Sequence, residues 1–195
     1  RGLDVAAYDI DRLSLLYWGL GAHLGQVISQ NSQGDLLGRV MDMEGGKYAG
    51  GGYYEQGVRG HRTNAFLAPH SDSSDVVGLL CVRPARRGGE SWIASSIAIY
   101  NRIRSQRPDL LAPLFACFRY DLVGKGRTAD ELTANRVPVY SWHEGLLSCR
   151  FNKQQIELGA ARLGETLTDA QREAIALVEE LAMSEELLLP MAFQP

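Results

Sequence analysis

The sequence predicts a mainly β fold, a sandwich or jelly roll with helices on its flanks, on three observations. Short apolar runs of strand length recur between residues 76 and 151, separated by polar turns. Helix-like segments are inserted before, between and after these runs. Their order lacks the regular strand–helix alternation of a doubly wound parallel sheet. The length of 195 residues suits a single domain over residues 1–195.

Composition and charge exclude several classes of protein. The chain is 45% hydrophobic and 22% charged with a net charge of −3, and no clustered Lys/Arg face predicts nucleic-acid binding. No apolar run approaches the roughly 20 residues that cross a bilayer, so we expect no membrane partner. The cysteines, Cys81, Cys117 and Cys149, form neither a C-x-x-C pair nor a zinc pattern. A reducing cytoplasm is the expected location.

Three helices are predicted from apolar spacing and capping residues. Residues 9–24 have apolar side chains at helical spacing after a capping Asp9, and a second helix starts at Ser96 and stops near Pro108. Thr168 and Gln171 form a capping-box pattern at the start of the last helix, which we expect Pro190 to end.

Strands are predicted from continuous apolar runs and from alternation. VVGLLCV at 76–82 has the length and composition of a buried strand, and SWIAS is a second short one. FACFRYDL, RVPVYSW and HEGLLSCRF are typical of strand pairs, and the final MAFQP begins another strand. Between the first helix and these strands, the glycine-rich segment 44–57 predicts either a flexible loop over an active site or a set of tight turns.

His70 and Asp72 are the candidate metal ligands. Residues i and i+2 of a strand point to the same face, so an imidazole and a carboxylate would project side by side. Together they are two-thirds of the 2-His-1-carboxylate ligand set of non-haem Fe(II) oxygenases. Asp75 would face the other way. A bare His-x-Asp also occurs by chance, with His70 capping a surface turn and Asp72 in an Asx-turn.

The surroundings of this motif carry a longer resemblance. Residues 58–103, VRGHRTNAFLAPHSDSSDVVGLLCVRPARRGGESWIASSIAIYNRI, closely resemble the TauD/TfdA family of Fe(II)- and 2-oxoglutarate-dependent dioxygenases. Weaker resemblance extends over nearly the whole chain, including Tyr120-Asp121 and Arg150-Phe151. The resemblance implies a double-stranded β-helix (a cupin-like jelly roll), with Fe(II) held by His70 and Asp72 and with 2-oxoglutarate as cosubstrate.

The same resemblance suggests roles for further residues, each with an ordinary alternative. Ser91 falls where the family places a hydroxyl that binds the 2-oxoglutarate carboxylate, although a strand-start serine also bonds backbone. Asn64 falls where the family contacts substrate, although a turn residue is equally expected. Arg59 and Arg62 could attract an anionic substrate, although exposed arginines are common.

The family's distal iron-binding histidine and its 2-oxoglutarate-binding arginine follow a Gly-Asp turn that we expect after Pro195, so the jelly roll would be C-terminally truncated. His143 lies in a predicted hairpin turn, and His61 is expected to be solvated. The predicted function is hydroxylation of a small-molecule C–H bond with O₂, releasing succinate and CO₂. Two alternatives stay open: an inactive jelly-roll binding or structural domain, and a zinc hydrolase using His70, Asp72 and His143.

Overall fold

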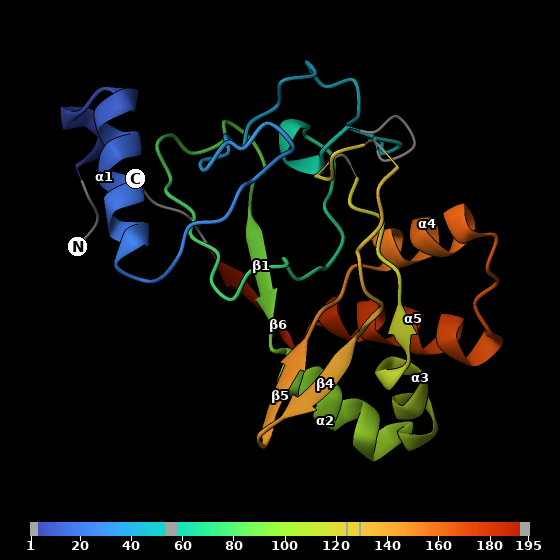
Figure 1. Ribbon diagram of the computed structural model, residues 1–195. Helices are drawn as coiled ribbons and strands as arrows, with labels where there is room; N and C mark the ends of the chain where they lie inside the picture. The colour runs from blue at the N-terminus through green and yellow to red at the C-terminus, as the bar shows by residue number, and fades with distance from the viewer. Residues whose placement is uncertain (1–3, 54–57, 124, 129, 192–195) are drawn as a thin grey trace.

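The structure, a computed structural model, describes residues 4–53, 58–123, 125–128 and 130–191. It combines helices with three separate two-stranded antiparallel sheets (Figure 1). The pairs are β1 (Ser91–Ala94) with β6 (Leu188–Met191), β2 (Cys117–Phe118) with β3 (Val137–Pro138), and β4 (Tyr140–His143) with β5 (Leu146–Cys149). No closed barrel is formed by the described residues, so the predicted double-stranded β-helix is not confirmed.

The predicted helices are present, and their capping residues act as expected. The α-helices are α1 (Ile10–Ala22), α2 (Ser96–Gln106), α3 (Leu111–Phe115), α4 (Lys153–Leu163) and α5 (Asp169–Ala182), with short 3₁₀ turns η1 (Val5–Ala7), η2 (Gly60–Arg62) and η3 (Pro108–Leu110). Asp9 accepts from the Arg12 N–H at 2.8 Å, and Thr168 and Gln171 form the complete capping box. The last helix ends at Ala182 rather than at Pro190, because Pro190 pairs with Trp92 in β6.

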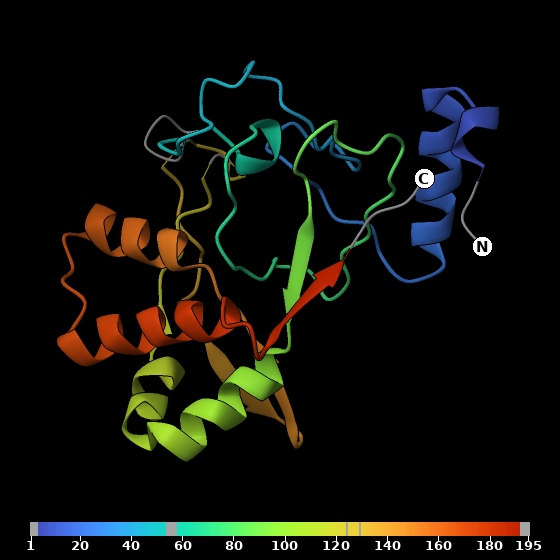
Figure 2. The same ribbon diagram turned by 180° about the vertical axis from the view of Figure 1, so that it is seen from behind.

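The hydrophobic core lies between α2, α3, α4, α5 and the β4–β5 hairpin. Ile103, Leu114, Ile156 and Ile175 are almost fully buried within it. Figure 2 shows α4 and α5 side by side, with α2 and α3 packed below them. Tyr140 adds an edge-on ring contact to Tyr100, with ring centroids 5.3 Å apart.

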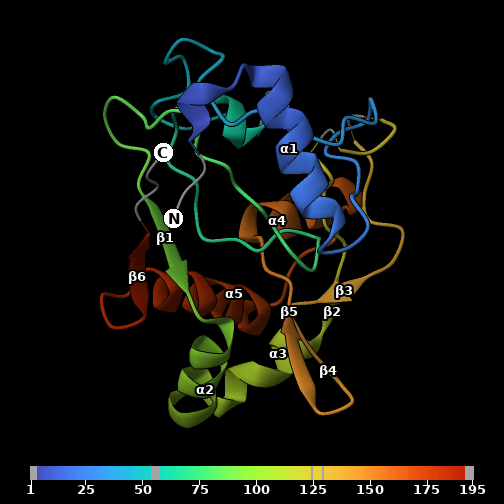
Figure 3. The ribbon, with the colours of Figure 1, turned by 90° about the vertical axis from the view of Figure 1, so that its left-hand side faces the viewer.

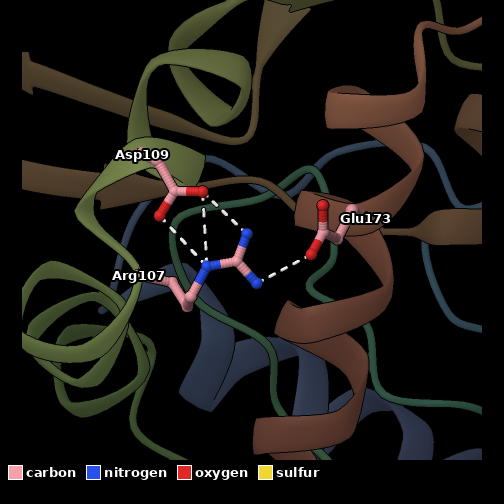
Figure 4. Close-up of polar contacts among 3 residues, drawn as sticks. All are labelled: Arg107, Asp109 and Glu173. Atoms are coloured by element: carbon pink, nitrogen blue, oxygen red, sulfur yellow. Dashed lines mark hydrogen bonds and ion pairs between the residues drawn. The ribbon is translucent and has the colours of Figure 1, made fainter.

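An arginine network joins the end of α2 to α5. The Arg107 guanidinium donates to the Asp109 carboxylate at 2.7 Å and to the Glu173 carboxylate at the same distance (Figure 4). These hydrogen bonds to Arg107 hold the pKa of Asp109 below its usual value. Because all three side chains are substantially exposed, the network orients the chain at this corner more than it stabilises the fold.

The first helix is set apart from this core. Figure 1 and Figure 3 show α1 at one side of the molecule, away from α2 and α3. Within α1, Leu13 is buried. The Tyr17 hydroxyl lies against Gly78, in the segment after the His-Ser-Asp motif, because a Cβ added to Gly78 would be 2.4 Å from this oxygen. The N-terminal helix is therefore held by few contacts.

The predicted buried strand at 76–82 is wrong for this structure. No strand is formed there, and Val76, Val77 and Leu79 are 62%, 54% and 53% exposed. A strand needs a neighbour for its N–H and C=O groups, and in the described part of the chain no segment pairs with this run. The run is apolar in composition, but composition alone does not supply a pairing partner.

The glycine-rich segment forms tight turns over the residues that are described. Gly45, Gly46, Gly51 and Gly52 all have positive φ angles, between 60° and 96°, which glycine adopts without strain. Residues 54–57 of the predicted loop lie outside the described residues. Among the helices that the structure describes, none is long and apolar enough to cross a membrane.

Candidate metal-binding site

The His-Ser-Asp motif lies in a segment that is anchored to the chain between β5 and α4. The Ser71 N–H donates to the Phe151 carbonyl oxygen at 2.7 Å, and the Phe151 N–H donates to the Ser71 hydroxyl oxygen at 2.7 Å. His70 forms an isolated antiparallel bridge with Asn152. The middle residue of the motif is therefore fixed, and the two candidate ligands flank it.

The exposed imidazole of His70 has one ring nitrogen committed to the backbone. Its Nδ1 lies 2.7 Å from the Ala68 carbonyl oxygen. A carbonyl oxygen accepts but does not donate, so Nδ1 carries the proton in the neutral ring. The lone pair is then on Nε2, which is the arrangement that a metal-binding histidine needs.

Asp72 lines an open pocket of about 190 Å³. The pocket also includes Ser73, Ser74 and Asp75 from the same segment, and its other wall comes from β3, β4, β5 and Arg150. Cys149 belongs to this wall, and burial raises the pKa of its thiol to about 11. The thiol therefore stays protonated near neutral pH, which makes it a poor nucleophile and a poor metal ligand.

Charged side chains from distant segments act on Lys125, and Asp72 is one of them. Lys125, in the loop after β2, is half-buried, and burial lowers its pKa; Arg59 and Arg150 lower that pKa further, while the Asp72 carboxylate raises it. Of these groups, Arg150 and Asp72 also line the same pocket. Arg59, Lys125 and Arg150 come from segments that are far apart in sequence.

His61 belongs to the same neighbourhood and is half-buried rather than solvated. Burial lowers its pKa first, and Arg59, Arg62 and Lys125 lower it further, against an opposing effect of Asp72. The imidazole is therefore neutral at physiological pH. Arg62, which the sequence suggests as a possible contact for an anionic substrate, forms an ion pair with the Glu44 carboxylate at 3.8 Å.

Of the predicted site residues, Asp72 lines this pocket, whereas His70, Ser91 and Asn64 do not. Ser91 is the half-buried first residue of β1, opposite Met191. Asn64 is exposed, and its amide nitrogen would lie 3.7 Å from a Cβ added to Gly46 of the glycine-rich segment. Neither residue lines the pocket beside Asp72, and their roles toward 2-oxoglutarate and substrate stay predictions.

The alternative zinc site is not formed. His143 is exposed near the turn of the β4–β5 hairpin. Across residues 4–53, 58–123, 125–128 and 130–191, no three His, Cys, Asp or Glu side chains are grouped closely enough to hold a metal ion. His70 and Asp72 nevertheless fit two places of an iron site, because an imidazole with a free Nε2 and a carboxylate are donors that suit Fe(II).

Two residues of this neighbourhood, Lys125 and Arg150, were not predicted as site residues. Arg150-Phe151 lies in a part of the sequence with family resemblance, and that was the available signal for Arg150. Nothing local marks Lys125, because its place beside Asp72 follows from the fold of the loop after β2.

Comparison with known proteins gives a family and two relatives. Residues 1–195 match the family described as taurine catabolism dioxygenase TauD, TfdA family. The chain is 31% identical over 196 residues to FR-33289 synthase of Streptomyces rubellomurinus (strain ATCC 31215), covering 100% of this chain and 56% of that protein. It is 27% identical over 119 residues to the taurine hydroxylase-like protein SAT17 of Stachybotrys chartarum (strain CBS 109288 / IBT 7711), covering 58% of this chain and 30% of that protein. The chain thus spans about half the length, or less, of these relatives.

Proposed function

Since this chain belongs to the TauD/TfdA dioxygenase family, we propose that the protein is an Fe(II)- and 2-oxoglutarate-dependent dioxygenase that hydroxylates a small molecule. The observation that carries the proposal is the hydrogen bond of His70: its Nδ1 bonds the Ala68 carbonyl oxygen, which leaves the Nε2 lone pair available to a metal, two residues before Asp72 in the sequence. Family membership supports an oxygenase, the available Nε2 supports His70 as an iron ligand, and Asp72 is proposed as the second ligand from its place in the motif.

In this proposal, the chain's own residues hold and orient the reactants. Bound Fe(II), with 2-oxoglutarate and O₂, would supply the oxidising power, and succinate and CO₂ would be the co-products. His70 and Asp72 would hold the metal, and the bonds between Ser71 and Phe151 would fix the segment that presents them. Ser91 is proposed to bind the cosubstrate carboxylate and Asn64 the substrate. We also propose that the three strand pairs are parts of a double-stranded β-helix.

The decisive experiment measures succinate formed from 2-oxoglutarate by the full-length protein with added Fe(II), together with anaerobic Fe(II) binding. We expect Asp72→Ala to abolish succinate formation and to weaken Fe(II) binding at least tenfold, with an unchanged melting temperature, because Asp72 is exposed and removal of its side chain creates no cavity. His143→Ala, on the exposed hairpin, is the matched control and should keep both properties.

Wild-type protein that binds no Fe(II) and forms no succinate would contradict the proposal and favour an inactive binding domain. Iron-dependent turnover that survives Asp72→Ala would contradict the ligand assignment while leaving the reaction class intact.

A further inference from the structure

Asn152 takes part in two structural elements at once. It forms the isolated antiparallel bridge with His70, and it directly precedes α4, which it caps. Its side-chain oxygen accepts the Gln155 N–H at 3.0 Å, and its carbonyl oxygen accepts the Ile156 N–H at 3.1 Å. Asn152 is buried, with 9% of its surface exposed. One residue thus joins a candidate iron ligand to the start of a helix.

Both roles of Asn152 require the same backbone conformation. A residue that caps the N-terminus of a helix has extended φ and ψ angles, and so does a residue in an antiparallel bridge. Asn152 has a φ of -158° and a ψ of 100°, which satisfies both. Residues directly opposite each other in an antiparallel pair project their side chains to the same face. A change in the Asn152 backbone is therefore passed directly to His70.

The first turn of α4 is held by contacts on two sides. The carbonyl oxygen of Gln155, whose N–H bonds the Asn152 side chain, accepts the Asp121 N–H at 2.9 Å. Lys153, the first residue of α4, forms an ion pair with Glu179 of α5 at 2.6 Å. Figure 2 shows these two helices side by side. The helix start therefore gives Asn152 a fixed base within the packed part of the chain.

The position of the His70 ring depends on this connection. The bond from Nδ1 to the Ala68 carbonyl oxygen orients the imidazole relative to its own segment, because Ala68 is two residues away. It does not place the segment relative to the core. The bonds between Ser71 and Phe151 and the bridge to Asn152 do so. Asn152 carries this contact into α4, so the helix start helps to determine where the available Nε2 lies.

We propose that Asn152 is a positioning residue for His70: because it caps α4 while it bridges to His70, it sets the place of the imidazole that would hold iron. This inference rests on the proposed oxygenase function and adds a residue that acts through His70 rather than on the metal or the substrate. The bond to the Gln155 N–H fixes the Asn152 side chain and restricts its backbone. Loss of the capping oxygen frees the helix start and loosens the bridge.

The test compares the loss of two helix caps in the full-length protein. Asn152→Ala removes the cap of α4, and Thr168→Ala, the matched control, removes the cap of α5, whose bonds are made with Gln171 of its own helix. Because each variant loses one capping side chain, we expect similar decreases in melting temperature. We expect Asn152→Ala alone to speed up amide exchange of Ser71 about tenfold or more, and to raise the anaerobic Kd for Fe(II) about tenfold.

Two further variants at the same position complete the test. Asn152→Ser keeps a capping oxygen without adding a charge, so we expect it to restore Ser71 exchange and Fe(II) affinity to nearly wild-type values. If Asn152→Ala does not fold, Asn152→Gly takes its place, because glycine at an N-cap costs less than alanine. The same two effects are then expected at smaller size.

Equal changes in Asn152→Ala and Thr168→Ala would overturn the inference, because Ser71 exchange and Fe(II) affinity would then follow overall stability. Unchanged Ser71 exchange in a folded Asn152→Ala variant would overturn it as well, and so would an Asn152→Ser variant that behaves like Asn152→Ala. The exchange measurement needs no iron. It therefore decides the role of Asn152 even if the wild type binds no Fe(II), which is the result that contradicts the proposed function.

Discussion

The parts of the chain before and after Ser91 differ in how much apolar surface they bury. Among the described residues, the earlier part buries Leu13, Tyr48 and Tyr53, whereas the later part supplies the whole of the continuous core. The earlier part also leaves much apolar surface exposed, including Leu15 at 67% and Phe66 at 68%. The metal motif belongs to the loosely packed part, but its anchors, Phe151 and Asn152, belong to the well-packed part.

The difference indicates that the two parts of the chain have different structural roles. The later part provides a well-packed support, and the earlier part places the candidate site residues against it through a small number of polar contacts. Substitutions in the support should therefore change global stability, and substitutions in the contacts should change the site locally. Paired substitutions in the two parts test this expectation.

The largest contrast is expected from the same substitution in two helices. Gly159→Ala in α4 would place a Cβ 2.1 Å from the Arg119 carbonyl oxygen, a backbone atom that cannot move aside, so we expect a loss of about 3 kcal/mol or more in the free energy of unfolding. Gly19→Ala in α1 meets nothing within 4 Å and should stabilise that helix by up to about 1 kcal/mol. Urea denaturation measures both, and equal effects would contradict the contrast.

The next largest effect is expected at the turn that carries Lys125. Asp121→Asn removes the charge that pairs with Arg162 at a fully buried position, and we expect a loss of about 2–3 kcal/mol in the free energy of unfolding. Asp109→Asn, in the exposed network of Figure 4, is the matched control and should cost much less. If the two variants are equally stable, Asp121 does not hold the turn.

A smaller effect is expected where the two parts are joined. Ser71→Ala removes the hydroxyl that accepts the Phe151 N–H, and we expect a loss of about 1 kcal/mol in stability. Amide hydrogen exchange should speed up around residues 70–72 and 151 while the core amides stay protected. Ser73→Ala, an exposed neighbour, is the control. Faster exchange throughout the core would instead show that the contact stabilises the whole fold.

The smallest effect concerns pH. Because the pKa of His61 is lowered in the folded state from an ordinary value of 6.5, the unfolded state takes up a proton more readily below that pH. The contribution of His61 to stability is fully present above pH 6.5 and is lost as pH falls from there toward the folded pKa. Between about pH 7.5 and 5, His61→Gln should therefore lose less stability than the wild type, as measured by urea denaturation across this range.

Features that depend on local chemistry were predictable from sequence. The capping residues Asp9 and Thr168 set the starts of α1 and α5, since each bonds backbone within three residues of itself. Helix α4 was not predicted, because Gly159 and a sparse apolar pattern obscure it. Its signals were Asn152, which caps its start, and Gly164, which ends it with a φ of 66°.

Features that depend on distant partners were not predictable. The run at 76–82 has the composition of a buried strand, but burial requires a neighbour that the composition does not specify. The motif residues His70 and Asp72 lie two positions apart in the sequence, whereas Lys125 comes under the influence of Arg59 and Arg150 through folding. The charges of a site are thus harder to predict from sequence than its candidate ligands.

The bonds between Ser71 and Phe151 join residues that are 80 positions apart. During synthesis the segment of residues 70–72 leaves the ribosome long before residue 151 does, and it stays without its anchor until residue 151 has emerged. Closing a loop of this length is entropically costly and is repaid when the distant partner has folded. The order of translation therefore delays assembly of the segment that holds His70 and Asp72 until β5 and the start of α4 exist.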